Sequence, residues 1–352
     1  MSITRTPFGT LPDGRPVEAI RLSGDGIDAT ILTWGATLQA LEVPDWNGTM
    51  GDVVLGHDDL ASYVATRRFF GATIGRYANR IAGGRFELAG ETVVVPANDG
   101  VHALHGGATG FDQHVWNVAS ISDAPHPSVT LTHTSPHGEN GFPGTVEASV
   151  TYALTGRGVL SMEFAATTDR TTVVSLTNHS YLNLGGVLGG GDILGDLLTV
   201  DAGAYLAIDP NAIPLLQPPM PVDDTPFDFR EPRKIGARIR EPHSQLHNGH
   251  GYDHNFCLSD AAGVRFAARV ESPRSGRIME LFTDRPGLQV YSGNYLDGTA
   301  TGKGGWQYRQ SDALCLEPQV WPDTPNRPDF GSAVLEPGEA YSHHSIYRFS
   351  AA

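Results

Sequence analysis

Residues 146–154 read Val-Glu-Ala-Ser-Val-Thr-Tyr-Ala-Leu, and residues 160–164 read Leu-Ser-Met-Glu-Phe. In both stretches every second side chain is apolar, and the side chains between them are mostly polar or small. This period of two places the apolar side chains on one face of an extended chain and the others on the opposite face. Residues 129–133 (Val-Thr-Leu-Thr-His) alternate in the same way. The pattern predicts β-strands that bury one face and expose the other to solvent.

Strand signals continue on both sides of this region. Residues 92–95 and 287–291 are shorter runs rich in β-branched or aromatic side chains. Turn sequences separate such runs, because Gly, Asn and Asp tolerate positive φ and Pro presets a turn. These turn sequences include Pro12-Asp13-Gly14, Asn47-Gly48, Asn98-Asp99-Gly100 and Gly138-Glu139-Asn140-Gly141.

Helical periodicity is weak throughout the chain. Only residues 59–66 and 232–240 are expected to form a few helical turns each, and Pro242 stops the second of these. No Ser/Gly-rich linker and no clear internal repeat divides the chain. We therefore predict an all-β fold, a single large antiparallel β-sandwich domain over residues 1–352 with few short helices.

Composition restricts the class of partner. The chain has 352 residues and a formal net charge of −15. Basic residues do not cluster beyond short pairs such as Arg67-Arg68, so we expect no nucleic-acid partner. An acidic surface also disfavours anionic membranes, and no apolar run approaches the roughly 20 residues that span a bilayer. The N-terminal residues lack a signal-peptide pattern, so we expect a cytoplasmic protein. Cys257 and Cys315 are expected to be buried free thiols.

Two histidines lie within polar clusters that interrupt the apolar pattern. His105 precedes Gly106-Gly107, where the chain can turn tightly and a ligand can approach the backbone. His179 lies in residues 175–184, where Asn and Ser side chains surround it between leucines. A histidine can act as a general acid because its pKa lies near neutral pH. Taken alone, each is more simply explained by a structural role, His105 as a turn histidine and His179 as a buried histidine bonded to a backbone carbonyl.

Glu317 follows the apolar run Leu314-Cys315-Leu316 and is expected to be partly buried. Burial of a carboxylate is costly unless the group is paired or functional. Burial also raises its pKa, which makes it a usable general base. The alternative is an ion-paired structural glutamate.

The sequence motifs give little support to a metal site or to a catalytic nucleophile. His243, His247, His250 and His254 have helical spacing, but glycines at 249 and 251 interrupt that helix. The chain contains no His-Glu-x-x-His motif and no Gly-x-Ser-x-Gly nucleophile elbow. We therefore expect neither a metal nor another cofactor.

Taken together, these clusters resemble the aldose 1-epimerase family, the galactose mutarotases. Matching segments occur in the family's order along almost the whole chain: residues 33–38, 52–56, 75–81, 98–100, 104–107, 110–112, 138–144, 178–181, 225–229, 252–255 and 322–326. Departures are small, with Leu182 where Phe is usual and Pro318 where Thr is common. The resemblance implies a galactose mutarotase-like supersandwich whose concave face holds a sugar.

The resemblance also implies an activity, the interconversion of the α and β anomers of a free aldose such as galactose or glucose. By motif match, Glu317 is the expected general base at the C1 hydroxyl and His179 the expected general acid at the ring oxygen. His105 corresponds to the family's second active-site histidine. Arg80 and Asp253 correspond to ligands of the sugar hydroxyls, and Asn79, beside Arg80 in the same motif, is expected to bind the substrate.

Other functions remain open at this point. The same fold could carry a non-catalytic sugar sensor or a hexose-6-phosphate 1-epimerase, and two carboxylates such as Asp253 and Glu317 could serve a glycoside hydrolase. The expected partner is a neutral monosaccharide, and the expected assembly is a monomer or homodimer. Trp116, Phe282 or Tyr291 could stack on the sugar, although core packing is the commoner role of such residues.

Overall fold

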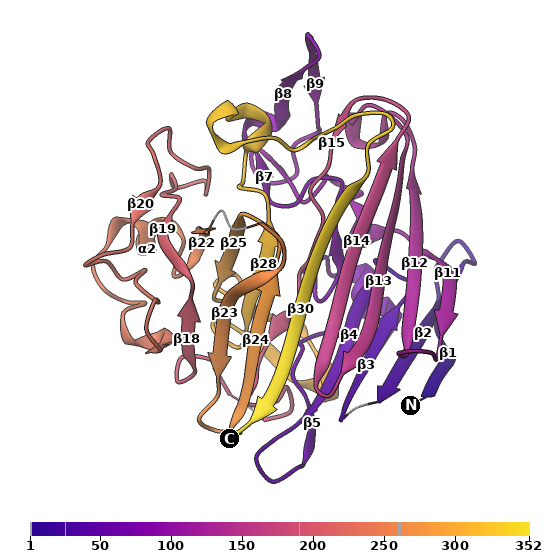
Figure 1. Cartoon of the computed structure of the whole chain (residues 1–352), viewed down its shortest axis with the longest axis vertical. Coiled ribbons are helices and arrows are strands. Elements are labelled where there is room, and N and C mark those ends of the chain that lie inside the picture. The colour runs from indigo at the N-terminus through magenta and orange to yellow at the C-terminus, as the bar shows by residue number, and fades with distance from the viewer. Residues whose placement is uncertain (1, 25, 190, 260–261) are drawn as a thin grey trace.

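The computed structural model describes residues 2–24, 26–189, 191–259 and 262–352. Its largest element is a nine-stranded antiparallel sheet (Figure 1). In spatial order its strands are β11 (Asn117–Ser122), β12 (Ser128–Ser135), β13 (Val146–Gly156), β14 (Val159–Thr168), β30 (Tyr341–Ala351), β24 (Arg277–Thr283), β23 (Arg265–Glu271), β18 (Leu197–Val200) and β21 (Arg233–Lys234).

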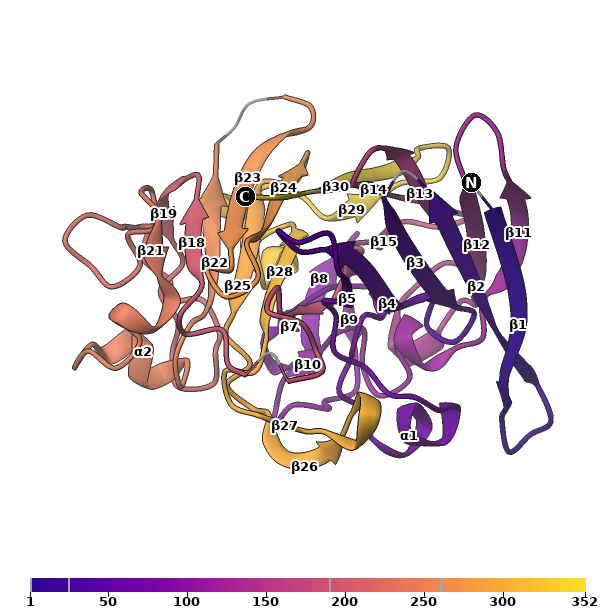
Figure 2. The same ribbon diagram turned by 90° about the horizontal axis from the view of Figure 1, so that it is seen from below.

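Two smaller antiparallel sheets pack against the large one, each facing a different half of it (Figure 2). One contains β1 (Ser2–Thr10), β2 (Pro16–Gly24), β3 (Ile27–Leu32), β4 (Thr37–Pro44) and β5 (Met50–Asp52). The other runs in the order β17 (Tyr181–Leu182), β28 (Leu314–Gln319), β25 (Gly287–Tyr291), β22 (Asp253–Leu258), β19 (Ala202–Tyr205) and β20 (Met220–Pro221).

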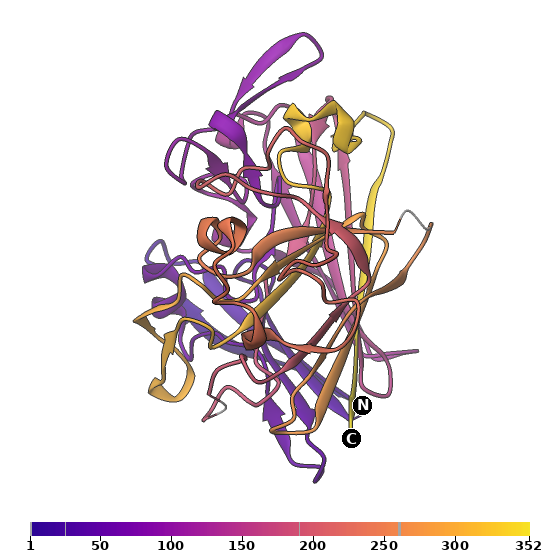
Figure 3. The ribbon, with the colours of Figure 1, turned by 90° about the vertical axis from the view of Figure 1, so that its left-hand side faces the viewer.

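Short strand pairs complete the architecture. They are β7 (Arg80–Ile81) with β10 (Ala103–Leu104), β6 (Thr73–Ile74) with β16 (Thr177–Asn178), β8 (Arg85–Leu88) with β9 (Glu91–Val94), β15 (Thr172–Val173) with β29 (Val334–Leu335), and β26 (Asp297–Thr301) with β27 (Gln307–Arg309). The β8–β9 hairpin projects at one end of the molecule, and both termini lie at the opposite end (Figure 3).

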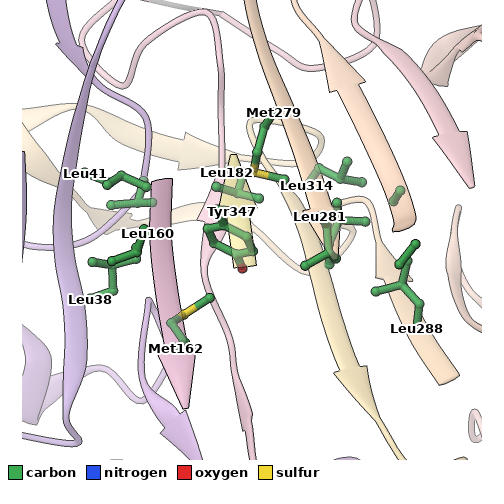
Figure 4. Packing of buried hydrophobic residues seen from close by; sticks show 14 of the residues in the cluster. Leu38, Leu41, Leu160, Met162, Leu182, Met279, Leu281, Leu288, Leu314 and Tyr347 are labelled. Atoms are coloured by element: carbon green, nitrogen blue, oxygen red, sulfur yellow. The ribbon is translucent and has the colours of Figure 1, made fainter. Parts of the chain in front are cut away.

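The core fills the space between the layers. Its largest cluster takes Leu38 from β4, Leu160 from β14 and Leu288 from β25, all 0% exposed (Figure 4). Leu182, one of the two departures from the family pattern, is buried in the same cluster. The sandwich expected from the alternating runs is therefore confirmed, and the runs at 129–133, 146–154 and 160–164 lie within β12, β13 and β14.

The helix predictions had mixed outcomes. Residues 59–66 contain α1 (Leu60–Ala65), which begins where the Asp59 side chain accepts a hydrogen bond from the Ser62 backbone N–H. The prediction at residues 232–240 is wrong, because Arg233–Lys234 pair with β18 as strand β21 and only a 3-10 turn follows. Tertiary strand pairing overrides the weak helical periodicity there. The second α-helix is instead α2 (Ser244–Asn248).

Two further sequence predictions concern the cysteines and the membrane. Cys315 is a buried free thiol, whereas Cys257 is only partly buried. In the described part of the chain, no helix has the length and hydropathy needed to cross a bilayer.

Candidate active site

Strands β22, β25 and β28 present different chemistry on their two faces. Leu288, Val290 and Leu316 point into the core and are 0% exposed. Gln289 lies opposite Glu317 across the β25–β28 ladder, and both alternate with those core residues. Because successive side chains of a strand point to opposite faces, these polar groups are directed away from the core. The sheet thus carries a polar surface that is backed by tightly packed leucines and valines.

Backbone turns bring two more sequence-predicted residues to this surface. Asn79 (φ 65°) and His105 (φ 50°) both adopt the left-handed region, which is unusual for residues with a Cβ. The β7–β10 pair, in which Arg80 lies opposite Leu104, holds the two turns side by side. Strained backbone that persists in a fold concentrates at functional sites, because the surrounding structure must enforce it.

A pocket lies over this surface. All six sequence-predicted site residues line it: Asn79, Arg80, His105, His179, Asp253 and Glu317. The sequence interpretation did not identify eight further lining residues as site residues: Arg67, Arg68, Phe69, Leu104, Tyr181, Gln289, Tyr295 and Leu296.

Of the three proposed stacking aromatics, only Tyr291 lines the pocket. Trp116 is 1% exposed within the main core cluster. Phe282 lies on β24 of the large sheet, where the Arg348 guanidinium covers its ring at 4.6 Å. Both were therefore wrong as candidates, because residue type alone does not tell which face of a strand a side chain occupies.

Glu317 and His179 form a buried pair on the pocket floor. Glu317 Oε1 lies 3.6 Å from His179 Nε2, and the two residues are 2% and 4% exposed. Burial, together with the nearby Asp253 carboxylate, raises the pKa of Glu317 well above its ordinary value, although Arg80 opposes this shift. Burial lowers the pKa of His179 to about 4. Low polarity disfavours charge on both groups, so they tend to share one proton.

The His179 imidazole is held from both sides. Phe69 stacks on it with ring centroids 5.7 Å apart, and Tyr181 stacks at 5.0 Å. The backbone N–H of His179 donates to the Ala72 carbonyl at 2.9 Å, and its carbonyl accepts from Gly71. Ring and backbone contacts therefore fix the direction in which Nε2 points.

A hydrogen bond determines the tautomer of His105. Its Nδ1 accepts a hydrogen bond from the Asn79 backbone N–H at 3.2 Å, so the ring proton resides on Nε2. Burial and the nearby His179, Arg80 and Arg67 lower the pKa of His105 well below its ordinary value, which keeps the ring neutral. A neutral imidazole with Nε2–H is a hydrogen-bond donor for a ligand hydroxyl.

Arg80 and Asp253 lie beside the Glu317–His179 pair and bring further charge into the pocket. Arg80 Nε donates to Asp99 Oδ2 at 2.8 Å, while its terminal amino groups remain suited to binding a ligand. Gln289 Nε2 donates to Asp253 Oδ1 at 2.7 Å. Burial alone would lower the pKa of Arg80, but the Asp253 and Asp99 carboxylates raise it, so the guanidinium stays charged.

The other two pocket arginines are paired with carboxylates. Arg67 makes a bidentate contact with Asp112, with both donor–acceptor distances 2.7 Å. Arg68 donates to both Asp297 oxygens at 3.1 Å and to the Tyr295 carbonyl. These arginines therefore hold loops in place around the pocket and carry little free positive charge into it.

Comparison with known proteins identifies close relatives. A sequence model of the family "Aldose 1-epimerase" matches residues 18–348. Galactose mutarotase from Mus musculus is 44% identical over 353 residues and covers 100% of both chains. Aldose 1-epimerase from Escherichia coli (strain K12) is 37% identical, with 97% of each chain covered.

Solved structures show the same similarity. An aldose epimerase homologue from C. elegans has a TM-score of 0.86 at 31% identity, covering 95% of this chain and 99% of the other. Galactose 1-epimerase from Lactobacillus acidophilus NCFM has a TM-score of 0.87 at 27% identity, covering 100% and 99%.

Proposed function

The chain belongs to the aldose 1-epimerase family of isomerases, and we propose that it interconverts the α and β anomers of a free aldose through Glu317 and His179. Galactose is the first candidate substrate, because several relatives carry that sugar in their names. The single observation that carries the mechanism is the buried pair, whose Oε1 and Nε2 atoms lie 3.6 Å apart on the pocket floor. One group can accept a proton while the other donates one.

The chemistry requires two proton transfers at the acetal carbon. Glu317 removes the proton of the C1 hydroxyl, and that electron pair forms the C1=O1 double bond. The C1–O5 bond breaks, and O5 takes a proton from His179. Rotation about C1–C2 presents the other face of the aldehyde, and closure follows with the two residues in exchanged roles. Each positioned transfer contributes typically about 10²–10⁴-fold.

The proton count of the pair suits this cycle. The opposite pKa shifts favour a single proton shared between Glu317 and His179 at pH values between the two shifted pKa values. The reactive form, a carboxylate beside an imidazolium, contains the same single proton. It therefore forms by transfer within the pair and needs no proton from bulk water.

The remaining residues bind and orient the sugar in this proposal. Arg80 donates to hydroxyls through its terminal amino groups, Asp253 accepts from another hydroxyl, and His105 donates through Nε2–H. Asn79 acts mainly through positioning, since its backbone N–H sets the His105 tautomer and its side-chain oxygen accepts from the Arg80 N–H at 2.8 Å. Gln289, which holds Asp253, joins this group from the structure alone.

The charge of the pocket favours a neutral sugar over a sugar phosphate. A phosphate needs unpaired arginine or lysine side chains. The three arginines that line the pocket instead contact Asp99, Asp112 and Asp297, and Asp253 and Glu317 lie beside them. A pure sensor would not require both an acid and a base on the floor of its site, so the enzyme is the preferred function.

Polarimetry on freshly dissolved α-D-galactose and α-D-glucose tests the proposal. We expect the wild-type protein to accelerate relaxation of the optical rotation, and the Glu317→Gln variant to lose at least about 10²-fold of that activity. Glu163→Gln, a matched change at a side chain that is 63% exposed on β14, should retain full activity. Near-wild-type turnover by Glu317→Gln would refute the assigned roles, and inactivity of the wild type on every free aldose would refute the proposed reaction.

A further inference from the structure

A second cluster of two histidines and a glutamate lies outside the pocket. His114 follows the 3-10 turn Phe111–Gln113, His133 lies on β12, and Glu139 opens the 3-10 turn Glu139–Gly141. One ligand atom from each residue lies within 4.8 Å of the others. The three residues come from three different segments of the chain, whereas the histidine series considered from the sequence, at 243–254, forms no such group among the described residues.

We propose that His114, His133 and Glu139 form a binding site for a divalent transition-metal ion of the zinc class. Imidazole nitrogen and carboxylate oxygen are the preferred ligands of such ions in proteins, together with thiolate. Glu139 Oε1 lies 3.4 Å from His114 Nε2, and Glu139 Oε2 lies 3.9 Å from His133 Nε2. Tetrahedral coordination at about 2.0–2.1 Å separates ligand atoms by about 3.3 Å. Only small side-chain adjustments would bring all three atoms onto one ion.

The His133 side chain provides independent support. It is only 9% exposed, and its Nε2 is a buried atom with no hydrogen-bond partner among the described residues. Burial of an unpaired polar nitrogen is costly. The rings of Phe111 and Trp116 pack against the imidazole at 5.0 and 5.5 Å and prevent it from turning toward other partners. Coordination of a metal ion would satisfy this nitrogen where it already points.

Surrounding groups also position the Glu139 carboxylate. The Ser135 hydroxyl donates to Glu139 Oε2 at 2.5 Å, and the buried Arg76 guanidinium donates to that same hydroxyl at 2.6 Å. A short chain of hydrogen bonds that starts from Arg76 therefore holds the Glu139 carboxylate in place.

An ion can reach the cluster from solvent. The His114 side chain is 24% exposed and forms the outer wall of the cluster. Its Nε2 lies 3.1 Å from the Thr109 carbonyl oxygen, so the ion would replace a proton in that contact. The carbonyl or a solvent molecule can then complete the coordination. Bound metal would thereby tie residues 109–114, which follow the His105 turn, to β12 and the 139–141 turn.

Cobalt spectroscopy and zinc calorimetry on the full chain test this site. The pocket group His105, His179 and Glu317 also places three ligand atoms within 4.8 Å, so the titrations are done in a Glu317→Gln background to weaken that competing site. We expect one equivalent of Co²⁺ to give the visible absorption of a four-coordinate ion, and Zn²⁺ to displace it. Adding Glu139→Gln or His133→Gln should weaken binding by at least about tenfold, and Ser135→Ala by about tenfold.

His114→Gln is the variant least able to disturb folding, because this side chain is partly exposed. It should abolish both the cobalt spectrum and the rise in unfolding temperature that Zn²⁺ produces in the parent protein. Unchanged titrations in His114→Gln and Glu139→Gln, or no saturable binding in the parent at submillimolar metal, would overturn the proposal. These measurements use no sugar, so their outcome is independent of the epimerase reaction.

Discussion

Glu317 and His179 show how one environment can shift two side chains in opposite directions. Both are buried on the pocket floor, and burial disfavours the charged form of each. The carboxylic acid therefore holds its proton more tightly and the imidazole less tightly than in water. Between the two shifted pKa values, the pair carries one proton, which is what a cycle with one donor and one acceptor requires.

This arrangement predicts a broad pH profile for kcat/KM. The acid limb should lie near pH 4, where a second proton enters the pair with the lowered pKa of His179. The alkaline limb should lie well above pH 4.5, where the raised pKa of Glu317 releases the shared proton. Polarimetric kcat/KM measured from acid to alkaline pH, corrected for the uncatalysed rate, checks this. An acid limb near the ordinary histidine value of 6.5 would contradict it.

Arg80 offers a test of binding as distinct from chemistry. Arg80→Ala should raise KM by about tenfold or more, because hydrogen bonds from a charged donor to the sugar are lost. The alkaline limb of the pH profile should also move upward, since Arg80 lowers the pKa of Glu317. Arg309→Ala, at an arginine that is 71% exposed, is the matched control. An unchanged KM in Arg80→Ala would show that Arg80 is structural.

At the scale of elements, two neighbouring residues of β28 have different roles, since Leu316 contributes to stability and Glu317 to activity. Leu316→Ala should lower the free energy of unfolding by about 2–5 kcal/mol, because it leaves a cavity in the core. Glu317→Gln should remove activity without such a loss, since it replaces a buried ionisable group that has an unpartnered oxygen. Urea unfolding of both variants, with polarimetry, checks the contrast. A large loss of stability in Glu317→Gln would contradict it.

The same elements explain what the sequence could and could not predict. Strands such as β13 and β14 can be predicted from the sequence because the alternation of apolar and polar side chains that marks them is a local pattern. The wrong helix at residues 232–240 arose because pairing with β18, some 35 positions away, decides that segment. Gln289 was missed because its role is a hydrogen bond to Asp253, a residue 36 positions away in sequence. Its alternation with Leu288 and Val290 was the available signal.

Phe69, Tyr181 and Tyr295 were missed for a related reason. Phe69 and Tyr295 reach the pocket through the fold and lack a distinctive local motif, whereas Tyr181 lies in the matched segment 178–181 but was assigned no role there. His105, His179 and Glu317 were identifiable because polar groups interrupt an apolar or glycine-rich context there and match the motifs of a known family. The sequence thus indicated the reacting groups better than the other residues that line the pocket.

At the scale of the whole molecule, the main core links the three large sheets. Leu41 of β4, Met162 of β14, Leu281 of β24 and Leu314 of β28 belong to one buried cluster. The polar face of β22, β25 and β28 therefore rests on a close-packed support, and interiors of this density resist deformation. Such support keeps Glu317 in place relative to His179, which is delivered by a separate loop.

The pairing of the pocket arginines with carboxylates also determines how substrate arrives. A neutral sugar is not drawn in by a long-range field, and the chain's net charge of −15 exerts no net pull on it. Encounter then depends on diffusion and on the fit of the mouth of the pocket, in contrast to enzymes that steer charged substrates.

We expect kcat/KM for galactose to change by less than about twofold between low salt and molar salt, where charge interactions are screened within about 3 Å. A steep decline with added salt, measured by polarimetry, would instead reveal a charged substrate. The site should therefore work equally well in dilute and in concentrated electrolyte.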